Sequence, residues 1–165
     1  ATDIPTYVGG GISEADCWCL TTNFTDSATM TSNLARFASK GFALLGTGMS
    51  ESSGIFTFPS TGYWDIIFQG LFQGANISAG SYCMTHIRVT ENNSSYAEAD
   101  SHSGCMINNS TSTNVSATSR LILDVTDTAT HKVAFSTQVS DSSITTSGNS
   151  SELGTCMWFV KLADT

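Results

Sequence analysis

The feature that most constrains this chain is a series of β-prone runs, separated by Gly, Ser, Asn and Asp clusters at intervals of about ten residues beyond Lys40. Helical periodicity of any length is absent. Short strands at this spacing are typical of a sandwich or barrel. The expected strands cover residues 41–47, 54–58, 62–73, 80–91, 95–107, 113–125, 131–139 and 154–162.

The run at 62–73 shows two distinct faces, because successive side chains of a strand point to opposite sides. One set is bulky and apolar and is expected in the core: Trp64, Ile66 and Phe68. The opposite set mixes apolar residues with Asp and Gln, which is unusual for a fully solvated face. A subunit contact with some polar content would need such a mixture, so we expect the contact to include Tyr63, Ile67 and Leu71.

The closing run at 154–162 is apolar on both faces and must therefore be covered on both. We expect Trp158 and Val160 on the core side. Met157 and Phe159 are then expected on the subunit contact.

Charge narrows the choice of partner. Fourteen Asp plus Glu stand against six Lys plus Arg, for a formal net charge of -8. A surface of that sign repels phosphate backbones and anionic lipid headgroups. The longest apolar stretches, such as residues 64–68, are far short of the roughly 20 residues of a membrane-spanning helix. No nucleic-acid and no membrane partner is expected.

The sequence contains five Cys residues, an odd number, so disulfides within the chain would leave at least one Cys unpaired. Buried reduced Cys, packing as a small hydrophobic residue, is one interpretation. A Cys83–Cys105 bridge between neighbouring strands is the oxidised alternative. Cys17 and Cys19 flank one residue, a spacing that is a weak signal for zinc.

Catalytic chemistry has little support in the pattern. No strand-turn-helix nucleophile elbow and no Gly-rich phosphate loop occurs in the sequence, so no catalytic, cofactor-binding or metal residue is expected. Glu98, Asp100 and His102 alternate on one strand and could bind a cation such as calcium through oxygen ligands. A solvated acidic face is the alternative interpretation.

The N-terminal part of the sequence differs from the rest. About fourteen residues, including the run Gly9 to Gly11, show no regular repeat of apolar residues and are expected to form an irregular arm. Residues 34–38 suggest a short helical turn. The expected organisation is one globular domain, with the arm and first strand in residues 1–37 and the main β domain in residues 38–165.

A family resemblance covers about 120 residues from Lys40 onward. The segment 53–68, in which Pro59 and Gly62 form a turn between aromatic runs, resembles the globular heads of complement's first component. The resemblance extends to residues 121–125, 132–135 and 155–162. It implies an all-β, ten-stranded jelly-roll sandwich of the tumour necrosis factor-like type, and a tight homotrimer.

The Ser-, Thr- and Asn-rich texture and the closing residues 159–164 resemble versions of this domain carried by bacterial viruses. That resemblance implies a non-enzymatic capsid decoration (cement) protein on the virion surface, binding the major capsid protein. One alternative is the receptor- or glycan-binding head of a phage fibre, with contacts in residues 92–96, 108–114 and 140–151. A secreted, complement-like recognition head is the other alternative.

Overall fold

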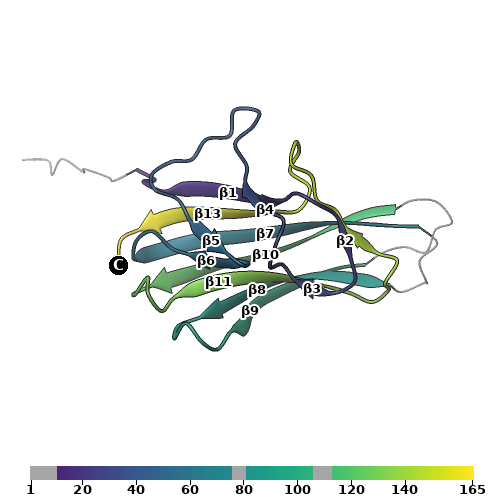
Figure 1. Cartoon of the computed structure of the whole chain (residues 1–165). Helices are drawn as coiled ribbons and strands as arrows, with labels where there is room; N and C mark the ends of the chain where they lie inside the picture. The colour runs from purple at the N-terminus through teal and green to yellow at the C-terminus, as the bar shows by residue number, and fades with distance from the viewer. Residues whose placement is uncertain (1–10, 76–80, 106–112) are drawn as a thin grey trace, which may run out of the picture.

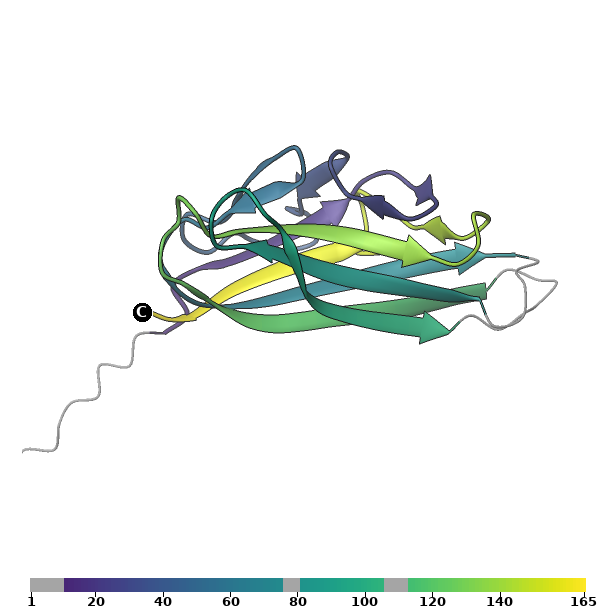
Figure 2. The same ribbon diagram turned by 90° about the horizontal axis from the view of Figure 1, so that it is seen from below.

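Two antiparallel β-sheets packed face to face make up the computed structural model, which describes residues 11–75, 81–105 and 113–165 (Figures 1 and 2). The first sheet, sheet A, contains β1 (Ala15–Leu20), β2 (Phe24–Thr25), β4 (Leu34–Arg36), β7 (Gly62–Gly74), β10 (Thr113–Val125), β12 (Thr145–Thr146) and β13 (Cys156–Ala163). The second, sheet B, contains β3 (Ala28–Thr29), β5 (Ser50–Ser52), β6 (Ile55–Thr57), β8 (Tyr82–Thr90), β9 (Ala97–Cys105) and β11 (Lys132–Val139).

The connections between the sheets define the topology. In sheet A, β7 pairs with β10 along its whole length and with β13 on its other side, and β13 pairs with β1. The chain crosses from β7 to the β8–β9 hairpin in sheet B, returns to β10, crosses again to β11, and ends on β13 beside the first strand. This is a jelly roll, so the expected all-β jelly-roll class is confirmed. Thirteen strands are described, and six of them, β2 to β6 and β12, have only two or three residues.

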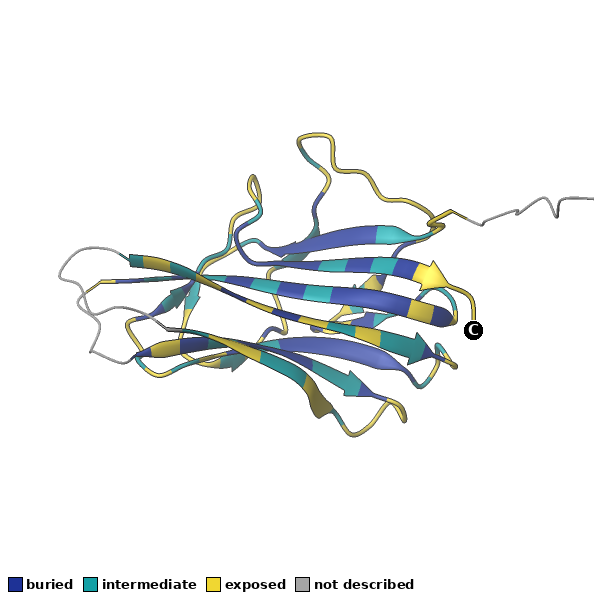
Figure 3. Cartoon of the chain, turned by 180° about the vertical axis from the view of Figure 1, so that it is seen from behind, coloured by how far each residue is buried: buried dark blue, intermediate teal, exposed yellow. Residues whose placement is uncertain are grey.

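Aromatic side chains from both inner faces fill the space between the sheets. Phe56 lies at the centre, fully buried, with its ring centroid 5.3–5.4 Å from those of Trp18, Phe135 and Phe159. Buried and less buried residues alternate along the long strands (Figure 3). On β7, the inner residues Trp64, Ile66 and Phe68 have no exposed surface.

The last strand faces the opposite way from the expectation. Met157 and Phe159 are completely buried in the core, whereas Trp158 and Val160 are half-buried on the outer face of sheet A. The register with β7 explains this, because Phe159 pairs with the core residue Ile66 and Trp158 pairs with Ile67. Residues paired across strands share a face. Assigning Met157 and Phe159 to a subunit contact, and Trp158 and Val160 to the core, was therefore wrong.

Two local predictions also fail. Residues 41–47 do not form a strand, because Gly41 and Gly46 have positive φ angles of 85° and 78° that interrupt an extended backbone. An isolated bridge between Ala15 and Leu45 pairs the backbone of this segment with β1. The helical turn expected at 34–38 is instead the short strand β4, which pairs with β1.

The described part of residues 1–37 contributes four strands. Strands β1, β2 and β4 belong to sheet A, and β3 pairs with β11 in sheet B. Residues 1–10 of the expected arm lie outside the described residues. The proposed division at residue 37 stays a prediction. In the described chain no helix is long and apolar enough to cross a membrane.

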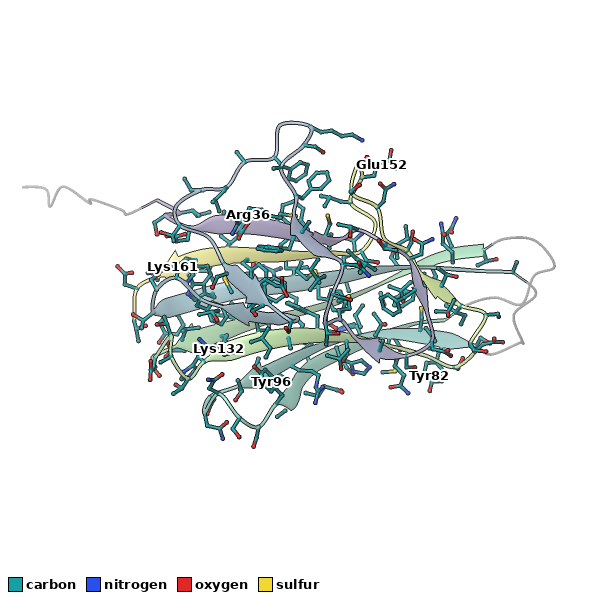
Figure 4. All side chains as sticks on the ribbon, viewed as in Figure 1. Arg36, Tyr82, Tyr96, Lys132, Glu152 and Lys161 are labelled. Atoms are coloured by element: carbon teal, nitrogen blue, oxygen red, sulfur yellow. The ribbon has the colours of Figure 1, made fainter. Side chains whose placement is uncertain are left out.

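A buried carboxylate fixes the segment that leads into β5. Asp16, only 4% exposed, accepts hydrogen bonds from the indole N–H of Trp18 at 2.9 Å and the backbone N–H of Met49 at 2.8 Å. The guanidinium of Arg36 binds both of its oxygens, at 2.9 and 3.1 Å, and also donates to the Met49 carbonyl oxygen at 2.6 Å. Asp16 thus joins β1, β4 and the segment before β5 (Arg36 is labelled beside β1 in Figure 4).

The turn between β5 and β6 requires glycine at position 54. Gly54 has a φ of 81°, and an added Cβ would overlap the carbonyl oxygen of Met30 and lie 2.8 Å from Thr31 Cα. Both obstacles are backbone atoms. We expect Gly54→Ala to lower the free energy of unfolding by about 2–3 kcal/mol, measured by urea denaturation.

Gly41→Ala is the matched control for that substitution. Gly41 has a similar φ of 85°, but no atom lies within 4 Å of the position that an added Cβ would take. The control carries only the left-handed backbone penalty of about 1 kcal/mol. Equal losses in the two variants would show that the contact with Met30 has no effect on stability.

Candidate assembly interface

The outer face of sheet A carries a patch of apolar side chains on three of its long strands, the neighbouring strands β10, β7 and β13. These are Tyr63, Ile67 and Leu71 from β7, Ile122 from β10, and Trp158 and Val160 from β13. Tyr63 is 41% exposed and Ile122 is 61% exposed, and the other four are half-buried. Pairing of Ile67 with Trp158 and of Asp65 with both Ile122 and Val160 brings these residues together. We call this set the sheet A patch.

One ion pair lies within the sheet A patch. Arg120 Nε and Nη2 each donate a hydrogen bond of 2.8 Å to one oxygen of Asp65. The hydrogen bonds and the negative charge of Asp65 raise the pKa of Arg120. The carboxylate is 8% exposed and its charge is matched by the bidentate guanidinium. A second protein surface could therefore cover this pair without burying an unpaired charge.

The segment before β5 extends the apolar surface over β1 and β13. Phe42 packs against Phe37 and Trp158, with ring centroids 5.1 and 5.4 Å apart. Leu44 and Leu45 on the same segment are 40% and 46% exposed. A cavity of about 130 Å³ remains beneath it, lined mainly by apolar side chains that include Val160. This segment therefore adds a raised apolar edge to the sheet A patch.

The structure brings some of the predicted contact residues together and separates others. Tyr63, Ile67 and Leu71 lie on one face as expected, but their role in a subunit contact is not tested by their placement. Met157 and Phe159 are in the core. Sequence reasoning missed Ile122, Trp158, Val160 and Phe42. An available signal for Ile122 was the run Leu121–Leu123, in which both strand faces are apolar.

Sheet B presents a different surface. A hollow of about 410 Å³ is lined mostly by polar residues of β3, β8, β9 and β11, including His86, Arg88 and Glu98. Glu98 lies 2.8 Å from Nδ1 of the buried His86, although that nitrogen lacks a well-aligned hydrogen bond. Asp100 accepts a hydrogen bond from the Arg120 backbone N–H at 2.7 Å.

The cation alternative for this strand is not supported by the arrangement. Glu98 and Asp100 are directed to His86 and Arg120, and no cluster of three metal-ligating side chains occurs within the described residues. Of the loops considered for glycan contacts, residues 108–112 lie outside the described residues. The Cys105 side chain also lies outside them, and the register pairs Cys83 with Gly104 rather than with Cys105.

Comparison with solved structures identifies the fold. The chain is similar to murine APRIL at pH 5.0, with 13% sequence identity, a TM-score of 0.64, and coverage of 90% of this chain and 98% of that chain. It is also similar to Eiger TNF from S. frugiperda, with 12% identity, a TM-score of 0.66, and coverage of 94% and 96%. The fold is therefore a tumour necrosis factor-like jelly roll. No protein-family model matches the chain, and no curated protein sequence matches it.

Proposed function

We propose that this protein is a non-enzymatic homotrimer that assembles through the outer face of sheet A and works by binding. The observation that carries the proposal is the sheet A patch, where Tyr63 and Ile122 expose 41% and 61% of their surface. Large apolar side chains clustered on the surface of an acidic chain are typical of a surface that another protein covers. The apolar edge formed by Phe42, Leu44 and Leu45 enlarges that surface.

A closed ring would cover two apolar surfaces of each chain. Tyr63 and Ile122 are exposed on β7 and β10, and Leu44 and Leu45 are exposed on the segment before β5, so one surface can pack against the other on a neighbouring copy. Contacts between two different surfaces of identical chains produce a ring when the rotation closes. The tumour necrosis factor-like fold and the resemblance to complement heads support three as the number of copies.

The finer proposal is that the trimer decorates the outer shell of a virion and binds the major capsid protein. Its support is the resemblance to domains carried by bacterial viruses, together with the net charge of -8, which disfavours nucleic acid and membranes as partners. Three linked contacts raise the avidity for a repetitive shell without a strong individual contact. Any ligand of the assembled shell stabilises it by mass action.

Quantitative mass spectrometry of density-purified virus particles from the source of the gene tests this finer proposal. We expect the chain to be present in a fixed ratio to the major capsid protein, with copy numbers in the hundreds per particle or in multiples of three per shell vertex or face. A few copies per particle would instead place it on a fibre or knob, and complete absence from particles would overturn a virion role.

A further inference from the structure

Three cysteines lie together beneath a small cover on the outer face of sheet A. Cys17 and Cys19 come from β1 and Cys156 from β13, and none of the three is disulfide-bonded. Phe37 and Leu153 pack on them and keep them 7% exposed or less. The segments that carry Phe37 and Leu153 rise on the same side of the molecule above β1 (Figure 1). The thiols of Cys17, Cys19 and Cys156 are therefore close to one another and shielded from solvent.

The strand register places two of these cysteines directly opposite each other. Cys19 pairs with Cys156, and Cys17 pairs with Trp158. Backbone hydrogen bonds of 3.0 Å from Leu20 N to Thr155 O, and from Lys161 N to Glu14 O, mark the hydrogen-bonded positions of this ladder. Since hydrogen-bonded and non-hydrogen-bonded pairs alternate, Cys19 and Cys156 form a non-hydrogen-bonded pair, in which the Cα atoms are closest, about 4.5 Å apart.

Of the three cysteines in this cluster, only Cys19 and Cys156 meet the geometry of a disulfide. A bridge needs Cα atoms about 4.4–6.8 Å apart and Cβ atoms about 3.5–4.5 Å apart. Directly opposite Cβ atoms at a non-hydrogen-bonded position approach the upper end of that range. Cys17 lies diagonally across from Cys156, where neighbouring residues are about 7–8 Å apart and the Cβ atoms only somewhat closer, still beyond the range of a disulfide. Cys17 and Cys19, two residues apart on one strand, have parallel side chains about 6.7 Å apart.

We propose that Cys19 and Cys156 form a site of oxidative cross-linking, which joins the first long strand of the fold to the last under oxidising conditions. The co-reactant is a small-molecule disulfide such as oxidised glutathione. One cysteine displaces a glutathione thiol to give a mixed disulfide, and the second cysteine then attacks the protein sulfur and releases the other glutathione. Overall, the two protein thiols lose two electrons and two protons, and one glutathione disulfide becomes two thiols.

Burial of the two thiols makes the formation of this disulfide slow, and the length of the loop that it closes makes the disulfide stabilising. Burial raises the pKa of Cys19, and it also raises the pKa of Cys156, where a hydrogen bond from Trp158 partly opposes the effect. Little thiolate is present at neutral pH, and the reagent must pass the cover formed by Phe37 and Leu153. Once formed, the bridge closes a loop spanning most of the chain, which restricts the unfolded state strongly.

The test is incubation of the reduced full-length protein with oxidised glutathione, followed by alkylation in denaturant and peptide mapping by mass spectrometry. We expect the intact mass to fall by two hydrogen atoms and one cross-linked peptide pair to contain Cys19 and Cys156. The melting temperature should rise by about 5–15 °C and return to its starting value with reductant. Leu153→Ala should accelerate the cross-link, because it opens the cover.

Cys17→Ser is the matched control, since Cys17 lies on the same face of the same strand and should leave the cross-link intact. Cys19→Ser and Cys156→Ser should each abolish it, and circular dichroism of the reduced variants verifies that they are folded. A cross-link of Cys17 to Cys19 or to Cys156, in place of the Cys19–Cys156 bridge, would overturn the proposal. The proposal would also be overturned if Cys19 and Cys156 were still recovered in alkylated form after exhaustive oxidation, both in the unmodified protein and in Leu153→Ala. None of these results depends on the trimer.

Discussion

Replacing Asp16 with alanine is expected to lower the free energy of unfolding by at least about 3 kcal/mol. The carboxylate is 4% exposed and accepts five hydrogen bonds, of which three come from uncharged donors: the Cys17 and Met49 backbone N–H groups and the Trp18 indole. Alanine leaves these donors buried without an acceptor. It also leaves the Arg36 guanidinium, 4.9 Å from the Trp18 ring centroid, without its counter-charge.

Denaturation in urea measures this effect, and Glu152→Ala is its control. Glu152 pairs with Lys40 at 3.6 Å, with side chains that are 71% and 60% exposed, so its removal should change stability by less than about 0.5 kcal/mol. In the thermal transition, Asp16→Ala should melt at least about 6 °C lower than the unmodified protein. Equal, small effects in both variants would show that the Asp16 network does not hold β1 to the segment before β5.

The double variant Tyr63→Asp with Ile122→Asp is expected to weaken self-association at least about 100-fold. Both residues are exposed in one chain, so the substitutions leave the core intact. In the assembled protein each would place an unpaired carboxylate in a desolvated contact, where it also repels the acidic charges of this chain. Size-exclusion chromatography with light scattering should show a folded monomer at concentrations where the unmodified protein is associated.

Ile55→Asp provides a matched control for the assembly variant. Ile55 is an isoleucine on a strand, 37% exposed, but it lies on β6 in sheet B, away from the sheet A patch. This variant should keep the oligomeric state of the unmodified protein. If Ile55→Asp dissociates the protein while the sheet A variant stays associated, the subunit contact lies on the opposite sheet.

Much of the framework could be predicted because strands such as β7 and β10 have clear boundaries in the sequence. The predicted strand at 62–73 differs from the observed β7 by one residue, since β7 ends at Gly74. The sequence could not predict in the same way which side chains of β13 point into the core. Both of its faces are apolar, so alternation cannot distinguish them, and only the register with Ile66 and Ile67 assigns Phe159 to the core and Trp158 to the outer face.

Only part of the candidate interface could be predicted from the sequence. Tyr63 and Ile67 stand out because they alternate with core residues within one strand. Phe42 and Leu44 instead resemble a strand in their composition. Their segment leaves the sheet because Gly41 and Gly46 adopt left-handed conformations, and Phe42 reaches Trp158 from a distant part of the chain. Such long-range contacts carry no local pattern.

We propose that three copies of this jelly roll assemble through the outer face of sheet A. Sedimentation equilibrium of the unmodified protein at micromolar concentration measures the number of copies. We expect a single species with three times the mass of the 17.4 kDa chain. A monomer with the mass of one chain at that concentration would contradict it, because the sheet A patch would then remain exposed to water.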